Sequence, residues 1–235
     1  MSHSPLKPVV LALDSAGSAC SVAIAAGGTV LCTERLATLH GQAETLLPMV
    51  DVAMRKAALP ASALDLIATT VGPGSFTGIR VGLAAARGIA LATGARLIGV
   101  TGFETVAALL PTEDLDPGGF LLVALESRRE DLYIQFFDRD RSPIGDPTAA
   151  MPETLAGAVS RAVAGAPLVV AGDAAGRVGG VLSRRSSTTV VENLAPDAVG
   201  VLRAALRRWR RGTAGDEPRP LYLRSPDVTI SSGGP

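Results

Sequence analysis

Histidine and cysteine are scarce in this sequence of 235 residues, which contains two of each. The cysteines, Cys20 and Cys32, lie in strand-like segments, so we expect buried thiols rather than a disulfide or a metal pair. Two histidines are too few for a histidine-based metal centre, although carboxylates remain as ligands of another kind.

An excess of basic residues is also missing, since Lys and Arg together number 22 and so do Asp and Glu. A protein that holds nucleic acid alone usually carries more positive charge, because contacts to phosphates supply most of the affinity. Any role with RNA is therefore expected to be indirect. Aromatic residues are few, but 47% of the chain is apolar, which is enough for a core of ordinary size.

Long hydrophobic runs are missing as well. The apolar stretch at residues 9–13 ends at Asp14 and is too short for a signal peptide. The longest uncharged stretch, residues 16–33, is interrupted by Gly27 and Gly28, which is typical of two strands and a turn rather than of a membrane span. These features predict a soluble, cytoplasmic protein without a membrane partner.

The predicted helices and strands occur in the same order in both halves of the chain. The first half has strands at 9–13, 20–26 and 30–35, a helix through Leu47, Val50, Met54 and Ala57, a strand at 66–71, a helix at 76–93 and a strand at 97–100. The second half has strands at 120–125, 132–137 and 142–144, helices at 152–164, 175–183 and 196–211, and strands at 168–171 and 188–191. Pro48 must lie in the first turn of its helix or it will kink that helix, and Pro152 and Pro196 are expected in the first turns of theirs.

Two successive units of this order are typical of ribonuclease-H-like lobes, as in actin, sugar kinases and Hsp70 chaperones. We therefore predict an α/β fold of this type, with two lobes that are each a mixed five-stranded sheet with flanking helices. The predicted N-terminal lobe spans 1–106, the smaller C-terminal lobe spans 107–212, and 213–235 is a loosely ordered tail. The last helix, 196–211, is a candidate to pack back on the first lobe. Such a fold does not by itself assign a function.

The turn Gly72-Pro73-Gly74-Ser75 stands between a predicted strand and a predicted helix, where phosphate-binding turns occur. It has no Lys for a Walker loop, and its glycine spacing differs from the dinucleotide fingerprint. Residues 73–103 contain no Asp or Glu to bind Mg²⁺ or a ribose, and Pro73 and Thr77 replace the glycines of a nucleophile elbow. A tight turn in which Ser75 caps the helix is therefore favoured over phosphate binding.

The helix after this turn carries small residues at steps of four, at Gly78, Gly82, Ala86 and Ala90. Arg80 and Arg87 lie near the same face. Small side chains let another element approach closely. Two interpretations stay open: the stripe packs with helices of a partner, or it packs flat on the chain's own sheet.

Residues 72–84, Gly-Pro-Gly-Ser-Phe-Thr-Gly-Ile-Arg-Val-Gly-Leu-Ala, resemble the signature of the TsaB family, also called YeaZ. Residues 11–15 and 19–23 resemble the first hairpin of that family. Other similar segments are 40–42 and 46–49 in the first helix, 97–101 with Glu104 at the end of the first lobe, and 221–224 near the C-terminus. The resemblance is close over the first lobe and weak in the second half.

The resemblance implies a role in making N6-threonylcarbamoyladenosine at position 37 of tRNAs that read codons beginning with A (ANN codons). TsaB proteins are not the catalyst. They pair with TsaD, a paralogue that transfers the threonylcarbamoyl group, and TsaE, an ATPase, joins that pair. The tRNA is then contacted indirectly, through the complex. A homodimer is an alternative for the free protein, and an independent nucleotide-dependent enzyme or metallopeptidase of the same fold is the alternative function.

The resemblance also implies which residues act. The helices that pack against TsaD correspond to residues 40–58 and 75–93, and the implied interface consists of His40, Glu44, Leu47, Val50, Met54, Phe76, Ile79, Arg80, Gly82, Leu83, Ala86, Arg87 and Ala90. The catalytic paralogue holds its metal with a His-x-x-x-His motif, whose positions here are Gly102 and Val106. Neither can bind a metal, so no catalytic residue and no metal ligand is expected.

Proteins of this fold hold nucleotide phosphates between the lobes, against two acidic turns that contain glycine. Arg128 and Arg129 stand where the second turn needs glycine, so only part of such a site remains. The implied degenerate site consists of Asp14, Ser15, Gly72, Gly74, Ser75, Gly172 and Asp173. We expect no cofactor in the chain itself, and ATP or ADP only at the interface of the complex.

Overall fold

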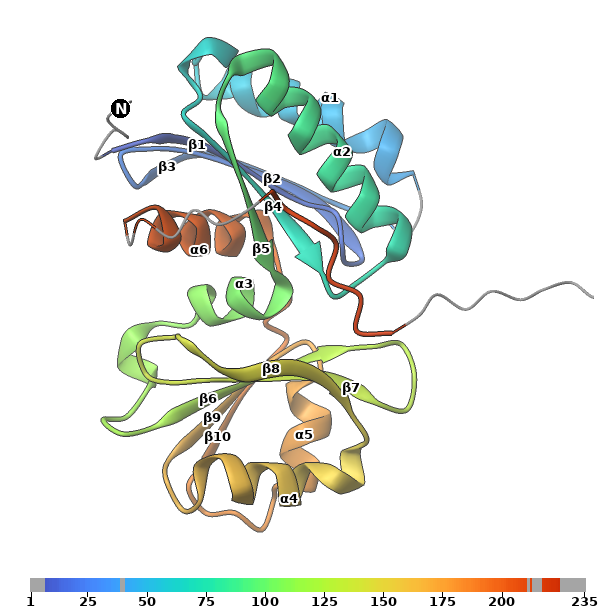
Figure 1. Ribbon diagram of the computed structural model, residues 1–235, viewed down its shortest axis with the longest axis vertical. Coiled ribbons are helices and arrows are strands. Elements are labelled where there is room, and N and C mark those ends of the chain that lie inside the picture. Colours follow the sequence, from blue (N-terminus) through green and yellow to red (C-terminus); the bar gives the residue numbers. More distant parts are fainter. Residues whose placement is uncertain (1–6, 39–40, 211, 213–216, 225–235) are drawn as a thin grey trace, which may run out of the picture.

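Two five-stranded sheets, one above the other in Figure 1, organise the chain into two lobes. The computed structural model describes residues 7–38, 41–210, 212 and 217–224. The strand order is β3-β2-β1-β4-β5 in the upper sheet and β10-β9-β6-β7-β8 in the lower, so the lower order read backwards repeats the upper one. The central strand of each sheet pairs antiparallel with the next strand and parallel with a later one. The predicted fold of two ribonuclease-H-like lobes is confirmed.

The upper lobe consists of β1 (Val9–Asp14), β2 (Ala19–Ala26), β3 (Thr29–Ala37), α1 (Gln42–Lys56), β4 (Leu66–Gly72), α2 (Phe76–Thr93), β5 (Arg96–Thr101) and α6 (Ala198–Arg210). The lower lobe consists of α3 (Gly102–Leu109), β6 (Phe120–Glu126), β7 (Leu132–Phe137), β8 (Pro143–Ala150), α4 (Pro152–Val163), β9 (Leu168–Gly172), α5 (Ala175–Val181) and β10 (Thr188–Glu192). Two short 3₁₀ turns, Ala61–Ala63 and Thr112–Asp114, lie between these elements.

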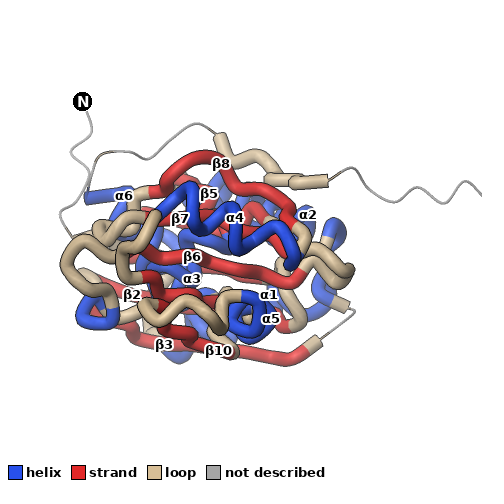
Figure 2. The backbone as a smooth tube through the Cα atoms, turned by 90° about the horizontal axis from the view of Figure 1, so that it is seen from below, coloured by secondary structure: helices blue, strands red, loops and turns tan. Residues whose placement is uncertain are grey.

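The helices form layers on both faces of each sheet. In Figure 1, α1 and α2 cover the outer face of the upper sheet, and α6 and α3 lie between the two sheets. The helices α4 and α5 cover the outer face of the lower sheet, which Figure 2 shows from below. Among the described residues, four buried apolar clusters join these helices to the two faces of each sheet. No helix in the described part is long and apolar enough to cross a membrane.

Pro152 begins α4 as predicted, whereas Pro48 and Pro196 do not lie in the first turns of their helices. Pro48 is inside α1, which already begins at Gln42, so the carbonyl of Glu44 lacks the amide that a helix normally offers it. Pro196 precedes α6, and the side chain of Asp197 instead accepts a hydrogen bond from the Gly200 amide at 2.8 Å. A proline two residues before a helix and one inside the first turn look alike in the sequence.

Two elements were missed or shortened in the sequence analysis. Helix α3 was not predicted, although Thr101 and Glu104 form a complete capping box at its start. Strand β8 runs to Ala150, well beyond the predicted segment 142–144, and it is mostly exposed, so it lacks the alternating apolar pattern. The predicted lobe boundary at residue 106 falls inside α3.

The small-residue stripe on α2 faces the chain's own sheet. A Cβ atom on Gly78 would overlap the carbonyl oxygen of Ser15, and one on Gly82 would lie 2.7 Å from the Ser15 hydroxyl. The Ser15 hydroxyl donates a hydrogen bond of 2.8 Å to the carbonyl of Gly78. Of the two interpretations left open by the sequence, the second is therefore correct: the stripe lets α2 lie flat on the end of β1.

The C-terminal strap, defined here as residues 217–224, follows α6 in the sequence but does not continue the layered fold. It is red in Figure 1 and runs past the end of β4 toward the boundary between the lobes. The amide of Leu221 donates a hydrogen bond of 2.7 Å to the carbonyl of Val71, the residue before Gly72. The strap is therefore attached to the upper sheet at the turn that precedes α2.

A matched pair of glycine substitutions tests the close approach of α2. We expect Gly78→Ala to lower the free energy of unfolding by about 1–3 kcal/mol, because the added methyl group displaces the backbone of Ser15. We expect Gly88→Ala, on the same helix with nothing within 4 Å of its Cβ position, to raise it by about 0.5–1 kcal/mol. Urea unfolding followed by circular dichroism measures both. Equal effects would contradict this packing.

Candidate partner-binding groove and interlobe cleft

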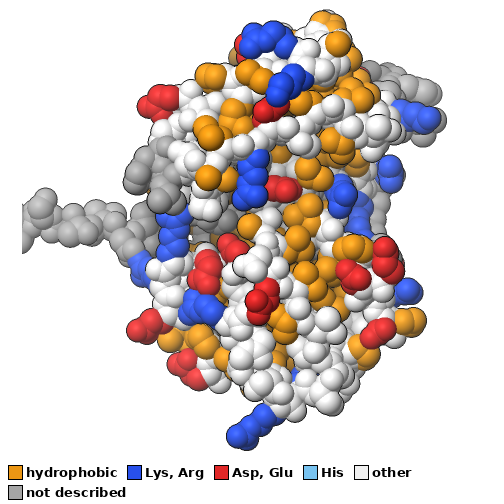
Figure 3. All heavy atoms as spheres, turned by 180° about the vertical axis from the view of Figure 1, so that it is seen from behind, with side chains coloured by type: hydrophobic (Ala, Val, Ile, Leu, Met, Phe, Trp, Pro, Cys, Tyr) orange, Lys and Arg blue, Asp and Glu red, His pale blue; other side chains and the backbone are white. Residues whose placement is uncertain are grey.

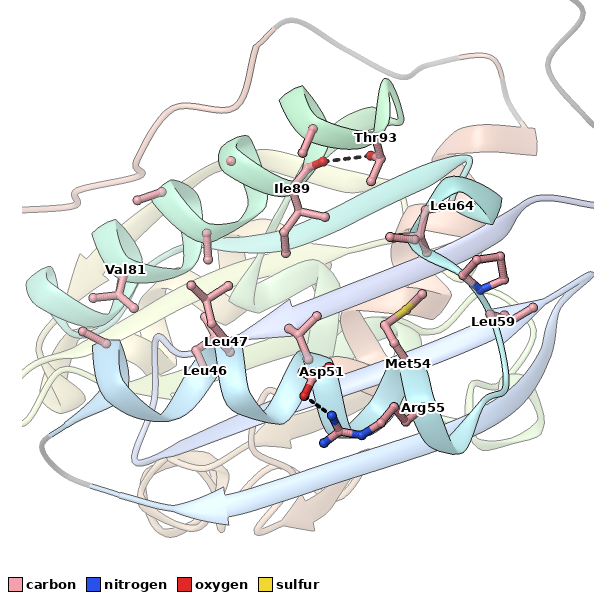
Figure 4. A pocket seen from close by; sticks show the side chains of 18 of the residues that line it. Leu46, Leu47, Asp51, Met54, Arg55, Leu59, Leu64, Val81, Ile89 and Thr93 are labelled. Carbon is pink, nitrogen blue, oxygen red and sulfur yellow. Dashed lines mark hydrogen bonds and ion pairs between the residues drawn. The ribbon is translucent and has the colours of Figure 1, made fainter.

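An open apolar groove of about 1090 Å³ lies between α1 and α2 on the outer face of the upper lobe. Figure 4 shows side chains of the two helices pointing toward each other across it. On α1 and α2 its apolar wall is made mainly of Leu46, Leu47, Val50, Met54, Val81, Ala84, Ala85, Ile89 and Ala92. Its charged residues, Asp51 and Arg55, pair with each other one turn apart on α1.

The groove exists because the facing positions of α2 are small. Val81, Ala84, Ala85, Gly88 and Ala92 recur at steps of three and four, which places them on one side of the helix. On the opposite wall the side chain of Leu47 remains 52% exposed. The two helices thus share an apolar floor without closing over it, and the surface is left for another molecule or for water.

The structure divides the residues implied as the partner interface into several groups. Leu47, Val50 and Met54 line the groove, and Glu44 is exposed on α1 outside it. His40 lies outside the described residues. The side chains buried under α2 against the chain's own core are Ile79, Leu83 and Ala86, together with the backbone of Gly82, while Ala90 is half-buried. These positions do not face the groove.

Sequence reasoning missed the α2 wall of the groove. Its residues form a second stripe of small side chains, one helix face away from Gly78 and Gly82. Their spacing was visible in the sequence, but nothing in the spacing says which of two small stripes is covered by the sheet. The contacts of Ser15 decide this.

A third side of α2 carries the remaining implied interface residues, and these contact the C-terminal strap. The rings of Phe76 and Tyr222 lie 5.2 Å apart, and the Arg80 guanidinium lies 3.6 Å from the centre of the Phe76 ring. Arg80 also donates a hydrogen bond of 3.2 Å to the Tyr222 hydroxyl. Arg87 donates one of 2.8 Å to the carbonyl of Pro218.

A smaller cavity, about 300 Å³, lies between the lobes beside the glycine-rich turn. Of the residues implied as a degenerate nucleotide site, Gly74, Ser75 and Asp173 line it. The other four do not. Asp14 and Ser15 are buried behind it, and the open sides of Gly72 and Gly172 face the carbonyls of Leu221 and Ala124.

The glycine-rich turn is occupied by contacts within the chain. Ser75 accepts a hydrogen bond of 3.2 Å from the Gly78 amide, which is the cap that the sequence predicts. The Ser75 amide donates one of 2.8 Å to the carbonyl of Ala16. A Cβ atom on Gly72, whose φ is +121°, would lie 2.5 Å from the carbonyl oxygen of Leu221. The strap therefore fills the space beside Gly72 that a bound group would need.

The remaining walls of the cleft carry side chains of both charges. Two acids, Glu126 and Asp173, and one base, Arg128, line the cavity, and Asp173 accepts a hydrogen bond of 2.9 Å from the Glu126 amide. Arg177 pairs with Glu126 at 2.7 Å, outside the lining residues. Carboxylates repel a phosphate unless a cation stands between them. The described residues contain no group of three or more His, Cys, Asp or Glu side chains arranged to hold a metal ion.

Asp14 is the carboxyl group with the most unusual environment. Burial raises the pKa of Asp14 from 3.8 to about 6, and Asp197 adds to the rise, while the Thr70 hydroxyl and the Ala16 amide oppose it. The group lies at the end of β1, close to the start of α6. Asp14 is therefore buried near the junction of the lobes and does not line the cavity.

A family description, TsaD: tRNA N6-adenosine threonylcarbamoyltransferase, matches residues 35–163. The tRNA threonylcarbamoyladenosine biosynthesis protein TsaB of Escherichia coli (strain K12) is 32% identical over 144 residues, 60% of this chain and 61% of that protein. The protein of the same name from Haemophilus influenzae is 30% identical over 139 residues, 58% of each chain. The chain thus spans about three fifths of the length of these curated relatives.

Solved structures extend the similarity to the whole fold. YeaZ from Pseudomonas aeruginosa superposes with a TM-score of 0.76 at 26% identity, over 92% of this chain and all of that chain. The ROK hexokinase from Thermus thermophilus superposes with a TM-score of 0.54 at 15% identity, over 85% of this chain and 97% of that one. The hexokinase shares the fold alone.

The pH dependence of stability tests the environment of Asp14. Its folded pKa lies above its unfolded value, so ionisation weakens the folded state fully above pH 6, and stability is regained as the pH falls toward 4. We expect Asp14→Asn to be more stable than the natural chain at pH 7.5 by up to about 3 kcal/mol, a difference that shrinks toward pH 4. Thermal unfolding at several pH values measures it. The control is Asp146→Asn, an exposed carboxyl on β8, and an unchanged slope in Asp14→Asn would contradict the burial argument.

Proposed function

Because this chain belongs to the TsaB (YeaZ) family, within the wider group that the TsaD description matches, we propose that it is a partner subunit in the synthesis of N6-threonylcarbamoyladenosine at position 37 of tRNAs that read ANN codons. In this proposal it binds a TsaD-type transferase through the groove between α1 and α2. A TsaE-type ATPase joins the pair, and the chain itself carries out no chemical step.

The observation that carries the proposal is the apolar groove. Its walls are almost free of charge, and Leu47 within it remains 52% exposed. An open apolar groove between two helices is a common site of contact with a helix of another protein. An open groove between two helices can be filled by helices of a second chain, so that the four helices pack as a bundle.

The transferase-type paralogue is a suitable occupant because it shares the fold. A related chain has an equivalent pair of helices, so the two pairs can pack against each other about a pseudo-twofold axis and bury both grooves. A second copy of this chain fits by the same geometry. A second copy is therefore the competing occupant of the groove when the transferase-type partner is absent.

The non-catalytic part of the proposal rests on residue types. Gly102 and Val106 stand at the positions of the metal-binding histidines of the paralogue, and both are buried at the start of α3. The acids Glu126 and Asp173 line the cleft cavity together with Arg128, and the carbonyl of Leu221 on the strap occupies the space beside Gly72. We propose that ATP or ADP binds only where the complex supplies further residues.

Indirect contact with tRNA is supported by the charge distribution. The chain has no net charge, and on the face in Figure 3 acidic and basic side chains are interspersed. A surface that binds RNA unaided usually concentrates positive charge. We propose that the complex, rather than this chain, supplies most phosphate contacts.

Two leucines of equal exposure test the groove. Leu47 in the groove and Leu36 at the edge of β3 are each 52% exposed, so Glu in either place costs the free protein little. We expect Leu47→Glu to weaken binding to the TsaD-type partner about 30-fold or more, because a charge is buried in an apolar contact, and Leu36→Glu to leave binding unchanged. Calorimetric titration with the cognate partner measures both.

Binding that is equally strong for both variants would show that the groove is not the interface. If size exclusion shows that Leu47→Glu also turns a dimer of the free chain into a monomer, the homodimer uses the same surface.

A further inference from the structure

The C-terminal strap contacts one side of α2 between Phe76 and Arg87. Tyr222 meets Phe76 and Arg80 in the first turns of α2, through the ring contact and the hydrogen bond described above. Further along the helix, Arg87 pairs with Glu217 at 3.2 Å and bonds to the carbonyl of Pro218. The strap thus contacts α2 at two places that are two to three turns apart.

The strap is also fixed to the core of the upper lobe. The hydrogen bond from the Leu221 amide to the Val71 carbonyl holds the strap against the end of β4. The strap can come this close because Gly72 has no side chain. Leu221 packs on the buried residues Ile79 and Leu83 of α2. These contacts are to backbone and core, so they fix the position of the strap rather than only covering a surface.

Its last described residue reaches the lower lobe. Arg224 forms an ion pair with Asp131, whose side chain is only 2% exposed. Asp131 lies at the end of the β6–β7 turn, where its other oxygen accepts a hydrogen bond of 2.8 Å from the Ser127 hydroxyl. A buried carboxylate is costly without a cation, so loss of Arg224 leaves Asp131 poorly compensated.

The strap and the groove lie on different sides of the same helix. Phe76, Arg80 and Arg87 face the strap, whereas Val81, Ala85 and Ile89 face the groove. The geometry of the groove depends on where α2 lies relative to α1. Whatever holds α2 therefore also shapes the groove.

We propose that the C-terminal strap couples the two lobes to α2 and holds the groove in its binding-ready form. The ion pair with Asp131 anchors the strap in the lower lobe, and Tyr222 and Arg87 transmit that anchorage to α2. Release of the strap loosens α2 and weakens partner binding without changing any groove residue. The claim that the strap supports partner binding rests on the proposed function, because that function supplies the partner that binds in the groove.

Hydrogen exchange in the full-length free chain tests the coupling. We expect Arg224→Ala to speed amide exchange in residues 76–83 of α2 about 10-fold, although Arg224 itself contacts the lower lobe. Asp131→Asn provides the same test from the other end of the ion pair and leaves every strap residue in place. The matched control is Arg219→Ala, an exposed arginine of the same segment, which is expected to leave exchange unchanged.

Affinity for the TsaD-type partner is then measured by titration for the same variants. We expect binding about 10-fold weaker for Arg224→Ala and Asp131→Asn, and unchanged for Arg219→Ala, since a loosened helix must be ordered on binding. Exchange in α2 that does not respond to either variant overturns the coupling. Faster exchange with full affinity overturns the claim that the strap prepares the groove.

The two proposals fail in different ways. If the natural chain does not bind the transferase-type partner, the proposed function is wrong, while the exchange measurement still decides whether the strap holds α2. Tyr222→Phe is a milder variant that still tests the coupling if Arg224→Ala or Asp131→Asn unfolds the protein. It keeps the ring beside Phe76 and removes only the hydroxyl that accepts from Arg80, so exchange is expected to rise in the first turns of α2 by a smaller factor.

Discussion

The close approach of α2 to the end of β1 is the constraint on which the rest of the upper lobe depends. Because Gly78 and Gly82 have no side chains, α2 can pack in direct contact with Ser15. A helix held that close to the sheet has one side buried and two sides free. One free side forms the groove with α1, and the other receives the C-terminal strap. Larger residues at 78 and 82 would lift the helix and disturb both contacts together.

Much of the architecture was predictable because it follows from patterns within short segments. The helix at Phe76–Thr93 is bounded by a Ser75 cap and Gly94, and its predicted limits agree with the structure. The central strands β1 and β4 are buried, mostly apolar runs, and the order of strands and helices along the chain gives the topology. Helix α3 and strand β8 were harder, because a short helix between lobes and an exposed strand have little apolar periodicity.

The candidate sites were less predictable, since they depend on contacts between distant segments. Two stripes of small residues on α2 look equivalent in the sequence, and only the position of Ser15 separates them. The glycine-rich turn raised the same difficulty. Its residues resemble a place for an anion, but Ser75 is used by the helix cap, and Gly72 is used by Leu221, about 150 positions further along the chain. No feature of the sequence near the turn predicts the contact between Gly72 and Leu221.

The return of α6 to the upper lobe has a consequence for how the protein is made. Val201, Leu202 and Ala205 cover the inner face of the first sheet, against Val10 and Leu66. A ribosome finishes the strands of that sheet at Thr101 but does not release α6 until about 100 residues later. At 5–20 residues per second the apolar face stays bare for roughly 5–20 s. The nascent first lobe is thus a natural substrate for chaperones until the second lobe has been synthesised.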